Sequence, residues 1–163
     1  MSNPGEADLT PITGTRQLAE WFAAGAKPRE RWGVGTEHEK FGFRRADLSP
    51  PPYEPDGIRA LLEGMAARGW TPILDDGKPI GLKRGGASIS LEPGGQFELS
   101  GGVLPDLHAT RLELREHIRE VHEAAGALGI GFAALGFHPL ASRGDMPWMP
   151  KGRYAIMRRH MPT

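Results

Sequence analysis

The sequence predicts an α+β fold, in which short antiparallel strands alternate with amphipathic helices. Two observations support this class. Alternating apolar and polar residues flank turn sequences at residues 76–77 and 93–95, which is the pattern of β-hairpins. Apolar residues recur at helical spacing in residues 58–69 and 106–129. At 163 residues, the chain has the length of one ordinary domain or of a piece of a larger one.

Composition argues against several classes of protein. Lys and Arg together number 20, as do Asp and Glu, so no net charge favours nucleic acid or an acidic membrane. The chain has no cysteine, which excludes a disulfide framework, a thiolate zinc site and a cysteine nucleophile. We find no signal-peptide pattern and no apolar stretch near the roughly 20 residues of a membrane span. We therefore expect a cytoplasmic protein that binds neither nucleic acid nor membrane.

The first elements are a leader and a helix. We expect residues 1–14 to form a flexible leader and the first helix to begin near Thr15. Leu18, Trp21 and Phe22 share one face of that helix, so we expect this face to pack against the rest of the fold.

Residues 34–43 alternate as in a β-strand, with Glu37, Glu39, Phe41 and Phe43 on one face. Carboxylates two residues apart on a strand lie side by side, roughly 7 Å apart at Cα. They repel each other in a dry setting, and Mg²⁺ relieves that repulsion. A solvated strand face with ion pairs to neighbouring cations is equally compatible with the spacing.

A helix at residues 58–69 and two hairpins follow. The first hairpin joins residues 71–74 to residues 80–82. The second joins residues 88–92 to residues 96–99, and alternation divides its side chains between two faces. The apolar face holds Ile89, Leu91, Phe97 and Leu99, and the polar face holds Ser88, Ser90, Glu92, Gln96 and Glu98.

Glu92 and Glu98 add two carboxylates to those of the preceding strand. If the polar faces of the strand and the hairpin meet, Glu37, Glu39, Glu92 and Glu98 surround one cavity. Four acidic groups gather in this way either to hold metal ions or because the polar face lies in water.

Two apolar elements follow the second hairpin. Asp106 is a suitable cap for a long helix whose apolar stripe is Leu107, Leu114, Ile118, Val121, Ala125 and Leu128. Residues 130–137 form an almost continuous apolar run, which predicts a buried strand. His108, His117 and His122 lie on the long helix, and we assign them no role because such residues are more often surface or packing residues.

A basic cluster ends the chain, where a short helix is expected from Gly152. Guanidinium groups match phosphate and carboxylate oxygens in pairs, so this cluster suggests a phosphorylated or carboxylate ligand. A solvated helix face is the alternative. The sequence has neither a phosphate-binding P-loop nor a dinucleotide-binding glycine motif, so ATP could bind only through metal ions and arginines. The cluster comprises Lys151, Arg153, Tyr154, Arg158 and Arg159.

Four segments resemble, in the same order, segments of the glutamate–cysteine ligases of proteobacteria and plants. They are VGTEHEKFGF (34–43), GASISLEPGGQFELSG (86–101), IGFAALGFHP (130–139) and MPKGRYAIMRRHMP (149–162). The resemblance implies a fold like that of glutamine synthetase, in which a curved antiparallel sheet forms a funnel with helices packed outside. It also implies the first step of glutathione synthesis. In that step ATP, with Mg²⁺, phosphorylates the γ-carboxylate of glutamate, and the amine of cysteine attacks the acyl phosphate.

The resemblance also assigns roles to individual positions. Glu37 and Glu39 match the metal-binding glutamates of the family, and Glu92 and Glu98 match the acidic residues of its second motif. Glu92 and Glu98 could hold either metal or the ammonium group of the substrate. We predict that all four are catalytic and metal-binding. The residues expected near bound glutamate and phosphate are Lys151, Arg153, Tyr154 and Arg158.

Two departures from the family qualify these expectations. A chain without cysteine cannot use the cysteine-pair regulation of plant members. Family members also continue well beyond the MPKGRY segment, so we expect residues 15–163 to be the amino-terminal portion of a catalytic domain, inactive alone. Two alternatives stay open: a related ligase that uses another amine acceptor, and a non-catalytic binding fragment.

Overall fold

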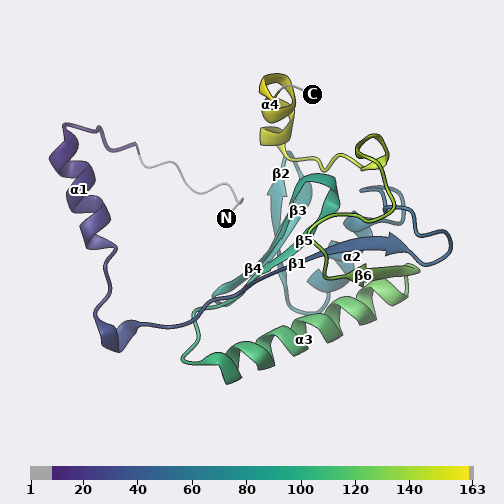
Figure 1. Cartoon of the computed structure of the whole chain (residues 1–163), viewed down its shortest axis with the longest axis horizontal. Coiled ribbons are helices and arrows are strands. Elements are labelled where there is room, and N and C mark those ends of the chain that lie inside the picture. Colours follow the sequence, from purple (N-terminus) through teal and green to yellow (C-terminus); the bar gives the residue numbers. More distant parts are fainter. Residues whose placement is uncertain (1–8, 162–163) are drawn as a thin grey trace.

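A six-stranded antiparallel sheet, in the order β2-β3-β4-β5-β1-β6, organises the protein. The computed structural model describes residues 9–161 (Figure 1). The strands are β1 (Glu37–Arg44), β2 (Thr71–Asp75), β3 (Lys78–Arg84), β4 (Ala87–Leu91), β5 (Phe97–Ser100) and β6 (Ile130–Ala133). The α-helices are α1 (Thr15–Ala24), α2 (Ile58–Ala66), α3 (Leu107–Gly126) and α4 (Gly152–His160), and 3₁₀ turns lie at Arg29–Arg31, Pro93–Gly95 and Arg143–Asp145.

The sheet is curved and is not closed in the part of the chain that the structure describes (Figure 1). The long helix α3 runs along one of its faces. This arrangement confirms the predicted α+β class and the curved antiparallel sheet. Within residues 9–161, no helix combines the length and the apolar character needed to cross a membrane.

The core lies between the sheet and the helices α2 and α3. The predicted apolar face of the second hairpin is buried, as is the stripe on α2. Complete burial of a Leu or Phe side chain contributes roughly 1.5–3 kcal/mol, so the hairpin face and the α2 stripe both contribute strongly to the stability of the fold. The core residues from α2, β4 and β5 are Ile58, Leu61, Leu62, Met65, Ile89, Leu91, Phe97 and Leu99.

Local signals in the sequence fix two of the boundaries. Asp76 and Gly77 both adopt positive φ angles, 48° and 72°, as a two-residue turn between β2 and β3 requires. The Asp106 side chain accepts a hydrogen bond of 2.8 Å from the backbone N–H of Ala109 and so caps α3.

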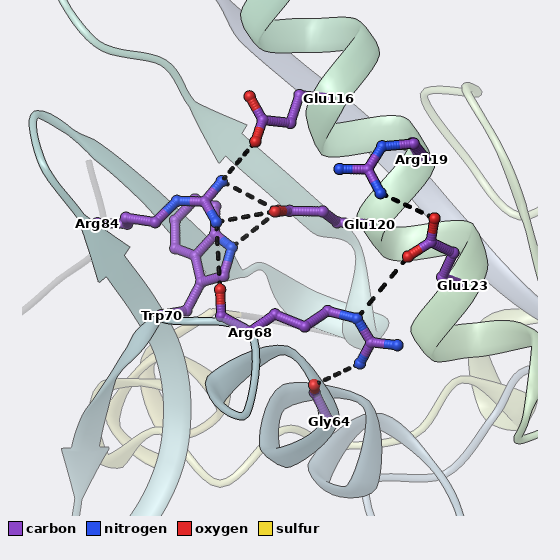
Figure 2. Close-up of polar contacts among 8 residues, drawn as sticks. All are labelled: Gly64, Arg68, Trp70, Arg84, Glu116, Arg119, Glu120 and Glu123. Atoms are coloured by element: carbon purple, nitrogen blue, oxygen red, sulfur yellow. Dashed lines mark hydrogen bonds and ion pairs between the residues drawn. The ribbon is translucent and has the colours of Figure 1, made fainter.

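A polar network fixes α3 to the sheet (Figure 2). Arg84 of β3 donates from its Nη1 and Nη2 atoms to the two carboxylate oxygens of Glu120 on α3, at 2.8 and 3.0 Å. The indole N–H of Trp70 donates to the same carboxylate at 3.0 Å, and the guanidinium lies 4.3 Å from the centre of the Trp70 ring. Burial raises the pKa of the Glu120 carboxyl, but the hydrogen bonds from Arg84 and Trp70 outweigh burial and lower it. We call Trp70, Arg84 and Glu120 the α3 anchor.

Three sequence expectations differ from the structure. The helix α1 forms at the expected place, but none of its residues is buried, so its apolar face does not pack on the body (Figure 1). The strand expected at residues 130–137 ends at Ala133, because the β1–β6 ladder ends at the pair Phe41–Ala133. Leu107, expected in the buried stripe of α3, is exposed. Of the expected leader, residues 1–8 lie outside the described part of the chain.

Candidate functional site

The strand β1 changes partner in its middle. Residues 37–40 pair with β5 on one edge, and residues 41–44 pair with β6 on the other edge. The predicted strand and the predicted hairpin are therefore neighbours in one sheet. Their polar residues share one face of that sheet.

Three of the predicted carboxylates lie on this shared face. Glu39 stands opposite Glu98, and Glu37 stands opposite Ser100, in the β1–β5 register. Glu37 and Glu39 are exposed, whereas Glu98 is buried. We call this surface the acidic face; its residues are Glu37, Glu39, Ser90, Glu98 and Ser100.

Neighbouring hydroxyl and amide groups hold two of these carboxylates, Glu39 and Glu98, in position. Ser90 donates to Oε2 of Glu98 at 3.1 Å, and Ser100 donates to Oε1 at 3.0 Å. Gln96 donates from Nε2 to Oε2 of Glu39 at 2.8 Å. The sequence placed Ser90 and Gln96 on the polar side of the hairpin but gave no sign that they would orient the glutamates.

Glu92 has different partners, which come from the start of α4. The Tyr154 hydroxyl lies 2.9 Å from the carbonyl oxygen of Leu91, to which it donates, and 3.3 Å from Oε2 of Glu92. Arg153 Nη2 is 3.4 Å from Oε2 of Glu92, and Lys151 Nζ is 4.0 Å from Oε1. We call Glu92, Lys151, Arg153 and Tyr154 the Glu92 cluster.

Burial shapes the chemistry of the Glu92 cluster. Lys151 and Tyr154 are buried, and Arg153 is exposed. Burial raises the pKa of the Tyr154 phenol to about 12, so the hydroxyl stays protonated and can donate a hydrogen bond. Burial also lowers the pKa of the Lys151 ammonium, and the Glu92 carboxylate opposes that change. Ser90 connects the acidic face to the Glu92 cluster, since its hydroxyl is 3.1 Å from the carboxylate of Glu98 and 3.4 Å from that of Glu92.

Arg158, the last predicted ligand-binding residue, lines the same cavity as Tyr154 of the Glu92 cluster. Its guanidinium is 4.7 Å from the centre of the Trp148 ring, in a cation–π contact. Both side chains line an open cavity of about 1090 Å³. This cavity lies between the turn at residues 93–94, the segment 136–148 and α4.

The four predicted metal ligands do not form one compact set in this structure. Among residues 9–161, no three His, Asp or Glu side chains are placed to hold a single ion. Glu39 and Glu98 lie side by side on neighbouring strands, and Glu92 contacts the cations of its own cluster. The metal-binding roles of Glu37, Glu39, Glu92 and Glu98 therefore stay predictions.

Two titratable residues to which the sequence analysis gave no role, Lys40 and His117, are buried. On the reverse side of β1, Lys40 donates to the carbonyl oxygens of His38 and Phe97, both at 3.3 Å. Burial lowers the pKa of the Lys40 ammonium to about 7. His117 of α3 is buried against the Phe97 ring, and burial lowers the pKa of its imidazole to about 3. Alternation along β1 placed Lys40 on the other face of the strand from Glu39. That pattern was the available signal that Lys40 would be buried.

A curved antiparallel sheet that presents carboxylates beside a cationic cluster agrees with the fold that the family resemblance implies. The chain belongs to glutamate-cysteine ligase family 2, whose model matches residues 33–163. This match confirms the family predicted from the four segments.

Named relatives agree with this membership. The chain is 48% identical to a chloroplastic glutamate–cysteine ligase of Medicago truncatula over 153 residues, which are 93% of this chain and 30% of the relative. It is 49% identical to glutamate–cysteine ligase A of Oryza sativa subsp. japonica, with the same two shares. It is 50% identical to the enzyme of Brassica juncea, over 93% of this chain and 29% of that relative.

Two consequences follow from these comparisons. The chain spans about 30% of the length of the curated relatives that it matches. All the named relatives are chloroplastic, and this finding overturns the cytoplasmic location expected from the sequence. That expectation rested on the lack of a signal-peptide pattern, and composition alone does not separate a chloroplastic protein from a cytoplasmic one.

Proposed function

We propose that this chain supplies part of the active site of an ATP- and Mg²⁺-dependent ligase. The reaction joins the γ-carboxylate of glutamate to the amine of cysteine, which is the first step of glutathione synthesis. One observation carries the proposal: in a chain of this family, Glu39 and Glu98 stand opposite each other next to the Glu92 cluster.

The acidic face has the donor chemistry that Mg²⁺ prefers. In nucleotide-dependent enzymes, Mg²⁺ is usually held by one or two carboxylates, while substrate phosphates and water complete its six ligands. Glu39 and Glu98 suit that role, and Glu37 lies two residues from Glu39 along the strand. Two carboxylates are enough for such a site, so it is compatible with residues 9–161 placing no three acidic side chains around one point. When bound, Mg²⁺ supplies positive charge that offsets the charge of the meeting phosphate and carboxylate groups.

The cationic residues act on the substrates. In the proposed reaction, an oxygen of the glutamate γ-carboxylate attacks the terminal phosphorus of ATP, and ADP leaves. The cysteine nitrogen then attacks the acyl carbon, and phosphate leaves as the nitrogen loses a proton. Arg153 is exposed beside Glu92 and can pair with a phosphate or carboxylate of the reactants, as can Arg158 in the cavity. Tyr154 and Lys151 hold the Glu92 carboxylate in position.

The metal proposal is tested by binding. We expect Glu39→Gln and Glu98→Gln each to weaken the binding of Mg²⁺–ATP by about tenfold, because each removes one anionic oxygen ligand; tenfold is about 1.4 kcal/mol. Isothermal titration calorimetry on the 163-residue chain measures this. The matched control is Glu123→Gln, which neutralises a half-exposed carboxylate on α3, on the other side of the sheet. Equal affinity in all four proteins would reject the metal assignment.

The reaction is tested by product formation in a full-length protein that contains this chain. Phosphate release from ATP should depend on both glutamate and cysteine. If another amine replaces cysteine with equal efficiency, the ligase class stands but the acceptor is wrong. If no amine supports release, the chain belongs to a non-catalytic member of the family.

A further inference from the structure

The helix α1 presents its apolar side chains to solvent. Leu18, Trp21 and Phe22 are 42%, 69% and 73% exposed, and no residue of α1 is buried. The Trp21 and Phe22 rings lie edge to face, with centroids 5.3 Å apart, so they form one continuous aromatic surface. In Figure 1, α1 stands well away from the sheet at the end of an extended segment.

The opposite side of α1 is charged. Arg16 and Glu20 form an ion pair of 2.7 Å between successive helical turns, and both side chains are exposed. At 100° per residue, this pair lies opposite the surface of Leu18, Trp21 and Phe22. An isolated helix of ten residues is too short to be stable in water by itself. A partner that covers only the apolar side would stabilise α1 and leave the ion pair in solvent.

The relatives indicate what that partner is. The match with the Medicago truncatula enzyme includes 153 of the 163 residues, so even if all the unmatched residues came first, α1 would lie inside it. The matched segment is 30% of that enzyme. A helix shared with a protein about three times as long therefore coexists there with a large amount of additional chain.

We propose that the apolar face of α1, formed by Leu18, Trp21 and Phe22, docks against the part of a family 2 ligase that lies outside the matched segment. The docking site on that part is an apolar groove bordered by polar groups, since the exposed side of α1 carries the Arg16–Glu20 pair. This inference depends on family membership and not on the proposed ligase reaction, so the binding of α1 and the catalytic assignments stand or fall separately.

A full-length chimera tests the docking. In it, the 163-residue chain replaces the matched segment of the Medicago truncatula enzyme, and hydrogen exchange of the α1 amides is compared with that in the 163-residue chain alone. We expect α1 to exchange at least about a hundredfold more slowly in the chimera. The double variant Trp21→Ser/Phe22→Ser should abolish this protection, whereas the matched variant Arg16→Ala/Glu20→Ala should keep most of it.

Two results would overturn the proposal. One is equally fast exchange of α1 in the chimera and in the 163-residue chain. The other is a dimer of the 163-residue chain, found by analytical ultracentrifugation, that the Trp21→Ser/Phe22→Ser variant dissociates, since the partner would then be a second copy. If the chimera does not fold, the same exchange measurement is made on the Medicago truncatula enzyme, over the segment matched to residues 15–24. Slow exchange there supports the docking of this helix, and fast exchange overturns it.

Discussion

The two faces of the sheet differ in the interactions that hold their side chains in place. The face toward α2 and α3 is closed by apolar side chains with almost no exposure, such as Leu62 and Leu99. On the acidic face, the exposed Glu39 is oriented by a single hydrogen bond from Gln96. The same alternating strands supply both faces. Stability is therefore concentrated on one side of the sheet and ligand chemistry on the other, and mutations should separate them.

The largest effect is expected in the core. Leu62→Ala removes a completely buried side chain and leaves a cavity, so it should lower the free energy of unfolding by about 2–5 kcal/mol. Urea denaturation of the 163-residue chain measures this change. Leu112→Ala is the control, because Leu112 is 66% exposed on α3. A comparable loss in the control would show that the helix face is less specifically packed than the structure indicates.

The next effect is a pH dependence that arises on the helix face. The pKa of His117 is about 3 in the folded state and about 6.5 when unfolded, because burial and the neighbouring cations Lys40 and Arg84 disfavour its charged form. Between these values the unfolded state binds more protons, so the contribution of His117 is complete above pH 6.5 and is lost as pH falls toward 3. This loss amounts to a few kcal/mol at most.

His117→Leu tests this pH dependence. Leucine suits the apolar surroundings and does not titrate, so the free energy of unfolding of the variant should fall less steeply between pH 6.5 and pH 4. His122→Leu is the control, since His122 is exposed on the same helix. Parallel pH profiles for wild type and His117→Leu would exclude His117 as the source.

A smaller effect is expected at the α3 anchor. Arg84→Met keeps an unbranched apolar stem but removes the guanidinium group, which leaves the Glu120 carboxylate with Trp70 as its remaining hydrogen-bond donor (Figure 2). We expect a loss of about 1–3 kcal/mol, because Glu120 is buried while Arg84 is partly exposed. Thermal melting should show the change, and Arg119→Met, which breaks only the exposed pair with Glu123, should cost less than about 0.5 kcal/mol.

The smallest effect on stability should come from the acidic face. Glu39→Gln keeps the size of an exposed side chain, so the free energy of unfolding should change by less than about 0.5 kcal/mol. The same protein should bind Mg²⁺–ATP more weakly, as proposed above. A large loss of stability in Glu39→Gln would contradict the division of roles between the two faces.

Local sequence patterns predicted most of the fold. Alternation placed Ile89 and Leu99 in the core, and the Asp106 cap identified the start of α3. Alternation also placed Glu37 and Glu39 on one face, but it could not show that β5 would set Glu98 opposite Glu39, because register depends on the pairing of distant strands.

Contacts between distant segments escaped prediction for the same reason. Tyr154 approaches Glu92 from 62 positions along the chain, and Arg84 reaches Glu120 from 36 positions away. The exposure of α1 was missed because an apolar stripe indicates that a surface will be covered, without identifying what covers it.

The change of partner within β1 also limits how the chain length can vary. Residues up to Lys40 follow the register of β5, and residues from Phe41 follow the register of β6. Insertion or deletion of one residue between them would have to turn one half of the strand over, because successive side chains point to opposite sides. Either Glu37 and Glu39 would point toward α3, or Phe41 and Phe43 would change sides. Variation in length near this junction should therefore be confined to even numbers of residues or to the loops beyond the strand ends.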